Sequence, residues 1–141
     1  MNIDDFKEHL KWAEGVRNFP YEDSVGKLTI GVGRNLDDVG LSDEEVEHLL
    51  HNDAARAISD ARCFAFWDSL SDIRQFVIAD LCFNLGITRF RGFVKTIAAL
   101  DAGDYETAAN EMEDSRWYRQ TGRRARKLVR IMRSGVYDDG T

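Results

Sequence analysis

The sequence contains few of the features that mark a scaffolded, fibrous or membrane-spanning protein. Its 141 residues include one proline and two cysteines, and charged residues (31%) interrupt the apolar ones (43%). This balance is typical of one soluble globular domain, here residues 1–141, and argues against disorder, collagen or a membrane span. Cys63 and Cys82 are too few for a disulfide scaffold and fit no zinc spacing, so we expect reduced, mostly buried thiols. The first twelve residues hold three acidic side chains and no apolar run, which predicts no signal peptide and synthesis in the cytoplasm.

Metal-binding patterns are also missing. His48 and His51 are three residues apart on an expected helix, but no third ligand accompanies them. Asp37, Asp38 and Asp43 do not have the spacing of a calcium-binding loop. We therefore expect no metal and no cofactor.

Charge is unevenly divided along the chain, whose net charge is −6. Residues 1–115 carry 11 basic and 23 acidic side chains, whereas residues 116–141 carry 8 basic and 2 acidic ones. Such asymmetry indicates that one face meets an anionic partner or a partner with both signs of charge. The basic last helix is either a solvated face or a surface attracted to anionic cell wall or lipid phosphates.

The hydrophobic periodicity predicts a small β-hairpin region followed by a set of helices. Ser42 and Glu45 form a capping-box pattern at the start of one helix, and the alternating Gly31 and Gly33 indicate a close approach of backbone or ligand. The fold class is α+β, with a hairpin lobe at about 15–60 and a larger helical lobe at about 1–14 and 61–135. We expect helices at 3–13, 43–61, 71–85, about 91–101, about 104–114 and from about 121 to 135, a hairpin within 21–34 and a short third strand near Leu36.

Two carboxylates stand at positions that suit acid-catalysed cleavage of a glycosidic bond. Glu14 is expected at the carboxyl end of the first helix, and Asp23 follows nine residues later among turn residues. A helix carboxyl end disfavours a nearby negative charge, so Glu14 suits a proton donor, while Asp23 suits the ionised partner. Taken alone, the pair is better explained as a solvated helix-terminal residue and a turn former.

The neighbouring residues add a resemblance to a known family. The blocks are Glu14-Gly15, Tyr21-Glu22-Asp23 and Thr29-Ile30-Gly31-Val32-Gly33, then Phe83-Asn84-Leu85-Gly86 with Gly92-Phe93, and Ser115-Arg116-Trp117-Tyr118-Arg119-Gln120-Thr121 with Arg124-Ala125. In order and spacing they resemble the phage-type lysozymes, the glycoside hydrolase family of the T-even bacteriophage lysozyme. The resemblance covers nearly the whole chain and implies a lysozyme-like fold with a central buried helix and a cleft between two lobes.

The resemblance also implies a substrate and roles for individual residues. The substrate would be peptidoglycan, cut at the β-1,4 bond between N-acetylmuramic acid and N-acetylglucosamine. Glu14 would be the general acid, and Asp23 and Thr29 would activate a water on the opposite sugar face, which gives inversion. Arg124 would approach Glu14 from the last helix. Phe83 and Thr96 match positions that contact sugar, with Thr96 replacing a serine, whereas Trp117 and Tyr118 are expected to pack rather than to bind sugar.

This sequence departs from the family pattern at two places. Arg34 stands where a histidine follows the glycine motif, and Asp53 corresponds to that histidine's partner, so we expect an Arg34–Asp53 ion pair without pH sensitivity. The stretch from Asn35 to Ser42 is much shorter than in the family member compared, which predicts a smaller hairpin lobe.

The expected biological role is that of an endolysin that lyses the bacterial host as a monomer. By family analogy it would need a holin to reach the wall in the periplasm, without inserting stably into the membrane or binding nucleic acid. One alternative is a lytic transglycosylase on the same substrate, which needs a catalytic Glu but no water-activating Asp. Others are a glycan-binding relative without activity and a helical module whose basic last helix binds nucleic acid.

Overall fold

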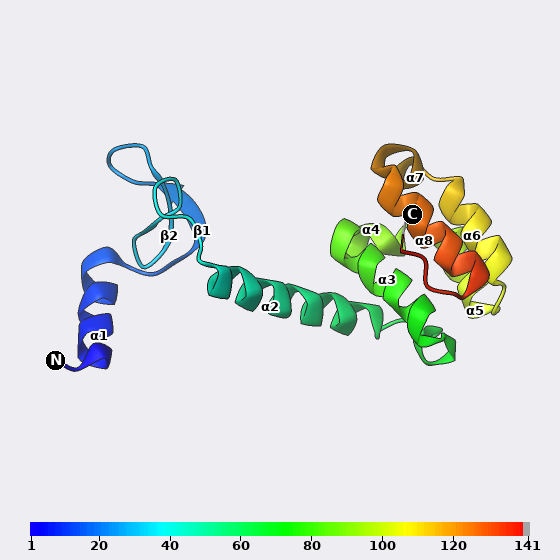
Figure 1. The fold of residues 1–141 in the computed structure, drawn as a ribbon, viewed down its shortest axis with the longest axis horizontal. Helices are drawn as coiled ribbons and strands as arrows, with labels where there is room; N and C mark the ends of the chain where they lie inside the picture. Colours follow the sequence, from blue (N-terminus) through cyan, green and yellow to red (C-terminus); the bar gives the residue numbers. More distant parts are fainter. Residues whose placement is uncertain (140–141) are drawn as a thin grey trace. The chain divides into compact units, whose positions relative to one another are not determined.

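The computed structural model describes residues 1–139, which form two compact units. The first unit is Met1–Leu49 and the second begins at Leu50, and the long helix α2 (Asp43–Ala61) belongs to both (Figure 1). A three-stranded antiparallel sheet lies in the first unit and a group of helices in the second. The fold is therefore of the α+β, lysozyme-like class.

Helix α1 (Ile3–Glu14) begins and ends where the sequence indicates. The side chain of Asn2 accepts hydrogen bonds from the backbone N–H groups of Asp4 and Asp5, which satisfies two of the donors left free at a helix start. Gly15 follows as the C-cap, and its N–H donates to the Lys11 carbonyl. Glu14 is consequently the last residue of the helix.

The sheet has the strand order β1-β2-β3, with β1 at Arg17–Glu22, β2 at Leu28–Gly31 and β3 at Arg34–Asn35. Tyr21 faces Thr29 across β1 and β2, and the pairing becomes irregular between Arg17 and Tyr21. Pro20 lies in that irregular stretch of an edge strand, where its missing N–H removes no inner ladder bond. The hairpin thus begins four residues earlier than predicted, and the expected third strand is present.

The loop after β3 is attached to the start of α2 by Arg34. Its Nη1 donates to the Gly40 carbonyl at 3.0 Å, and its guanidinium forms two contacts of 2.8 Å with the Glu45 carboxylate. Glu45 also accepts from the Ser42 N–H at 2.9 Å, and the Ser42 hydroxyl accepts from the Glu45 N–H at 3.1 Å, which confirms the capping box. Asp53 lies eight residues after Glu45 on the same helix, which corresponds to about 12 Å along the helix axis at 1.5 Å per residue. The predicted Arg34–Asp53 pair is therefore wrong.

This arrangement makes the first unit sensitive to acid. The Arg34 guanidinium and the Ser42 N–H lower the pKa of Glu45 from 4.5 to about 2. A carboxyl whose pKa is lower in the folded chain stabilises the fold above its unfolded pKa, and this contribution is lost as the pH falls toward 2. In thermal unfolding, we expect Glu45→Gln to be less stable than the wild type near neutral pH and to approach it between about pH 5 and pH 2.

Two variants control for this result. Arg34→Met should show the same convergence, and Glu47→Gln, which changes an exposed carboxyl on the same helix, should not. If the difference in thermal stability between Glu45→Gln and the wild type were the same at every pH, the lowered pKa of Glu45 would be contradicted.

The second unit is built around helix α3 (Asp72–Leu85), as its apolar composition predicts. Val77, Ile78 and Leu81 are fully buried, Ser71 caps its start, and Gly86 ends it. The surrounding elements are the short 3₁₀ helix η1 (Trp67–Ser69) and the helices α4 (Ile87–Arg91), α5 (Val94–Asp101), α6 (Tyr105–Glu113), α7 (Arg116–Thr121) and α8 (Arg123–Ser134).

Two short helices, α4 and α7, are present that the sequence analysis does not predict. The expected helix at 91–101 begins at Val94 as α5, after a turn at Gly92 and Phe93 that separates it from α4. The expected last helix is α8, and Gly122, whose φ of +72° favours glycine, separates it from α7.

Helix α8 and Trp117 both contribute to the core. The apolar stripe of α8 is buried and consists of Ala125, Leu128, Val129 and Met132. Trp117 is also buried, and its Nε1 donates to Asn84 Oδ1 at 2.9 Å.

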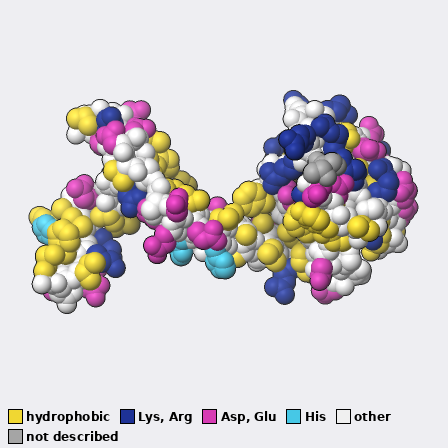
Figure 2. Space-filling model, in the orientation of Figure 1, with side chains coloured by type: hydrophobic (Ala, Val, Ile, Leu, Met, Phe, Trp, Pro, Cys, Tyr) yellow, Lys and Arg dark blue, Asp and Glu magenta, His cyan; other side chains and the backbone are white. Residues whose placement is uncertain are grey.

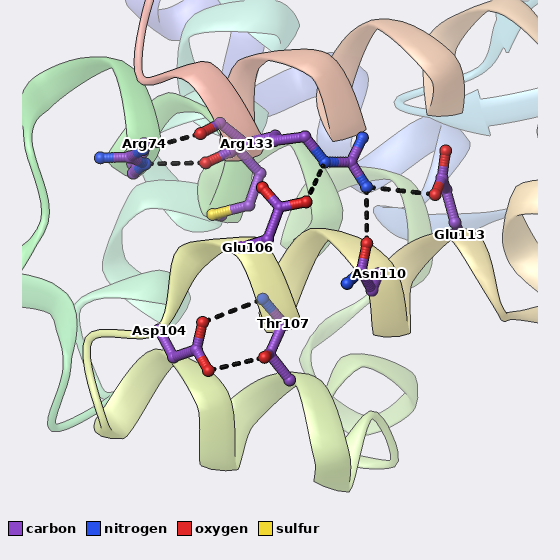
Figure 3. Close-up of polar contacts among 8 residues, drawn as sticks. Arg74, Asp104, Glu106, Thr107, Asn110, Glu113 and Arg133 are labelled. Atoms are coloured by element: carbon purple, nitrogen blue, oxygen red, sulfur yellow. Dashed lines mark hydrogen bonds and ion pairs between the residues drawn. The ribbon is translucent and has the colours of Figure 1, made fainter.

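Two arginines connect α8 to its neighbours (Figure 3). Arg133 donates from α8 to Glu106 at 3.0 Å, to Asn110 at 2.8 Å and to Glu113 at 3.1 Å, and all three acceptors are on α6. Arg74 of α3 donates to the carbonyls of Met132 and Arg133 at the carboxyl end of α8. These bonds fix the end of α8 between α3 and α6 (Figure 1).

The two thiols have different environments. Cys82 is buried, and this burial raises its pKa to about 11, whereas Cys63 is exposed, contrary to the expectation of two buried thiols. Both cysteines are free. Within residues 1–139, the helices are too short or too polar for any of them to cross a bilayer.

Candidate active site

The Glu14 carboxyl lies against Gly33, one of the two alternating glycines at which the sequence predicts a close approach of backbone or ligand. A Cβ atom placed on Gly33 would be 2.9 Å from both Cδ and Oε2 of Glu14. Only a residue without a side chain leaves this space free, and the φ of +67° at Gly33 also favours glycine. The exposed carboxyl at the end of α1 thus lies beside the turn after β2.

Asp23 is fixed by the turn that joins β1 to β2. Its Oδ1 accepts hydrogen bonds from the backbone N–H groups of Val25 and Lys27, both at 2.9 Å. Its own N–H donates to the Lys27 carbonyl, also at 2.9 Å. Among residues 1–139 no hydrogen bond is donated to Oδ2, which leaves this oxygen for a ligand.

Thr29 is the third member of the group and is one of two buried polar residues within the described chain. It is 3% exposed, and its hydroxyl donates to the Lys27 carbonyl at 2.9 Å. Because the hydroxyl proton is used there, the oxygen offers lone pairs to any further partner. Thr29 and Asp23 are therefore both anchored to the backbone of Lys27, a residue that the sequence analysis does not single out.

The pairing of the strands places these groups on one side of the hairpin. Tyr21 faces Thr29 and Asp23 bonds to Lys27, so residues 21, 23, 27 and 29 share a face. Asp23 Oδ2 and Thr29 Oγ1 are therefore two oxygen acceptors on this face. Hydrolysis of an acetal needs a proton donor and an acceptor that activates a water, and carboxyl groups can supply both functions.

Phe83 and Arg124, predicted to bind substrate, lie together in the second unit. The Arg124 guanidinium is 6.0 Å from the centre of the Phe83 ring, and its Nε donates to Asp80 at 2.8 Å. The two side chains border a largely apolar hollow of about 370 Å³ between α2 and α3. The partner Asp80 has no signature in the sequence. The expected approach of Arg124 to Glu14 joins residues of different units and stays a prediction.

Thr96 lies in a different hollow from Phe83. It is 2% exposed and lines a space of about 380 Å³ together with Lys95, Glu111 and Asp114. The sequence analysis leaves Glu111 out, but the structure places it beside Thr96. The described residues include no group of three His, Cys, Asp or Glu side chains that could hold a metal ion.

Comparisons with known proteins agree with the motifs. The family model described as phage lysozyme matches residues 11–134. Two proteins of Dictyostelium discoideum, named "Probable T4-type lysozyme 2" and "Probable T4-type lysozyme 1", are 23% and 24% identical, and each alignment covers 95% of this chain and 96% of the relative. The "Pre-baseplate central spike protein Gp5" of Enterobacteria phage T4 is 26% identical over 91% of this chain but only 27% of its own length. The first alignment spans 164 positions, so it contains residues of the relative that have no counterpart here.

Proposed function

Because the chain belongs to the phage lysozyme family, we propose that it hydrolyses the β-1,4 bond between N-acetylmuramic acid and N-acetylglucosamine in peptidoglycan. The family supports a peptidoglycan-hydrolysing enzyme of the glycosidase type. The observation that carries the finer proposal is the contact of the Glu14 carboxyl with Gly33, in the same unit as Asp23 and Thr29. A proton donor and two water-holding acceptors then belong to one small sheet and the helix before it.

The proposed reaction is a single displacement. Glu14 donates its proton to the glycosidic oxygen as the bond from this oxygen to the anomeric carbon breaks. A water held by Asp23 Oδ2 and Thr29 Oγ1 attacks that carbon from the opposite face and gives its proton to Asp23. The configuration of the anomeric carbon is inverted, as in other glycosidases that place a water between substrate and base.

Three residues of the second unit are proposed to bind the glycan. The Phe83 ring is 48% exposed and provides an apolar surface of the kind that packs against a sugar ring. Arg124 lies beside it, and Thr96 contributes to the separate hollow with Glu111. These contacts would position the glycan without taking part in proton transfer.

The proposed role is lysis of a bacterial host. The enzyme would act as a monomer on the wall in the periplasm and would depend on a holin to reach it. The match to full-length relatives named lysozymes favours an independent enzyme. The match to part of a phage spike protein makes incorporation into a larger phage protein the second candidate.

The products of digestion test the proposal. Purified peptidoglycan is incubated with the protein, and the released sugar ends are analysed by mass spectrometry and by NMR immediately after cleavage. We expect reducing N-acetylmuramic acid ends that first appear as the α-anomer. Ends with a 1,6-anhydro ring would instead identify a lytic transglycosylase, and new reducing N-acetylglucosamine ends would show that another bond is cut.

Gly33→Ala should displace the proposed acid. The added methyl group would occupy the space of the Glu14 carboxyl, which can move away because it is the end of a flexible side chain. We expect activity to fall roughly 10–100-fold, since small displacements of a reacting group have effects of this size. The positive φ should also cost about 1–2 kcal/mol of stability. Turbidity loss of permeabilised Gram-negative cells and denaturant unfolding measure the two effects.

Gly40→Ala is the matched control for this prediction. Gly40 has a similar φ of +64°, but a Cβ there would meet only the Leu36 carbonyl at 4.0 Å. It should lower stability to a similar extent and leave activity in place. Equal loss of activity in both variants would mean that backbone strain, rather than Glu14, accounts for the effect.

A further inference from the structure

A strongly cationic hollow lies on the second unit, along α8. It has a volume of about 500 Å³, and we call it the cationic groove. Figure 2 shows Lys and Arg side chains gathered on this part of the second unit. Two carboxylates, Asp80 and Asp139, also line the groove, so positive charges exceed negative ones by three. Its five cationic residues are Arg123, Arg124, Arg126, Lys127 and Arg130.

The cations form a row along one face of α8. Positions 123, 126, 127 and 130 are spaced by three or four residues, so their side chains lie on one side over about 10 Å of helix. The opposite side is the apolar stripe, whose residues are at most 1% exposed. Arg123 and Arg126 are exposed and, among the described residues, form no ion pair.

Other members of the row already bind oxyanions of the same chain. Arg124 donates to Asp80 at 2.8 Å, and Arg130 donates to Asp138 of the C-terminal segment at 2.6 Å and 3.4 Å. Lys127 lies 5.0 Å from the centre of the Tyr137 ring. The acidic segment after α8 thus neutralises one end of the row, while Arg123 and Arg126 remain available.

We propose that the cationic groove binds a flexible phosphodiester chain with small polyol repeats. A row of cations along a hollow suits a linear chain of phosphates. This function goes beyond cleavage of the glycan and uses neither Glu14 nor Asp23.

A bilayer and a nucleic acid fit the groove less well. Helices that lie in a membrane surface bury an apolar face in it, but the apolar face of α8 is already buried in the core. Single-stranded nucleic acids are held by bases stacked on aromatic rings. The groove contains one aromatic residue, Phe76, which packs edge-on against Tyr137, and Lys127 lies against the Tyr137 ring.

Fluorescence anisotropy with end-labelled poly(glycerol phosphate) tests the proposal. We expect binding that disappears when salt rises from about 0.1 M to about 1 M, which shortens the Debye length from roughly 10 Å to roughly 3 Å. Arg123→Gln/Arg126→Gln should raise Kd about tenfold, since exposed ion pairs contribute up to about 1 kcal/mol each. Asp138→Asn, which removes the internal competitor of Arg130, should lower Kd.

The matched control is Arg89→Gln/Arg91→Gln, which removes two exposed arginines from α4. It should leave Kd unchanged, and both double variants should unfold like the wild type. Absence of binding, equal weakening by the control, or binding at least as tight to oligo-dT of equal phosphate number or to phosphatidylglycerol vesicles would each overturn the proposal. Glu14→Gln should bind the polymer normally, so the result is independent of the proposed hydrolysis.

Discussion

Replacing Glu14 by glutamine should lower the rate of peptidoglycan cleavage by about 10²–10⁴-fold, the usual contribution of a general acid. The amide has the shape of the carboxyl and fits the same space against Gly33, but it cannot donate a proton to a leaving oxygen. Glu14 is exposed at the end of its helix, so the free energy of unfolding should change by no more than about 0.5 kcal/mol. Initial rates on purified peptidoglycan, measured beside denaturant unfolding, separate the two quantities.

The same helix offers a control for this variant. Glu8 is exposed, accepts a hydrogen bond from Lys11 at 2.9 Å and lies six residues before Glu14 on α1. Glu8→Gln should therefore retain activity. If Glu14→Gln retained more than half of the wild-type rate, Glu14 could not be the acid, and the hydrolase mechanism would have to be abandoned.

Asp23→Asn should reduce the cleavage rate by about 10²-fold or more, because the attacking water loses the group that accepts its proton. The asparagine Oδ1 can still accept from the Val25 and Lys27 N–H groups, so the turn should keep its shape. The folded hairpin would then lack only the charge and the basicity of the free oxygen. Rates should be compared at saturating substrate, where a loss of binding does not contribute.

Asp37→Asn is the corresponding control in the same unit. Asp37 Oδ2 accepts from the Leu28 N–H at 2.7 Å, so it is also a carboxylate bonded to the sheet backbone, but it belongs to another loop. We expect the Asp37→Asn enzyme to keep its activity. An active Asp23→Asn enzyme that releases 1,6-anhydro ends would favour the transglycosylase, which needs no activated water.

Local patterns predict much of the fold because their physical causes are local. The capping box of Ser42 and Glu45 and the helical period of α8 each depend on neighbours within one or two turns. The alternating glycines mark a close approach at Gly33, but they do not identify its partner, Glu14, which belongs to another element. The short helices α4 and α7 are harder to predict, because five or six residues are too few to display a helical period of apolar residues.

Side-chain partners are less predictable because several candidates of the same charge occur together. Helix α2 carries six acidic side chains, and Arg34 pairs with Glu45 rather than with the predicted Asp53. Arg133 belongs to the basic helix that the sequence analysis describes as a solvated face, but its guanidinium donates hydrogen bonds to three acceptors on α6. Arg124 is expected from its motif, but nothing in the sequence indicates its bond to Asp80.

The space that Gly33 leaves for a carboxyl has a practical consequence for protein engineering. Substituting loop glycines is a common way to stabilise an enzyme, because it restricts the unfolded chain. At this position any larger residue would intrude on Glu14, so a library screened only for heat resistance could accumulate stable proteins that no longer work. Directed evolution of this chain should keep codon 33 constant.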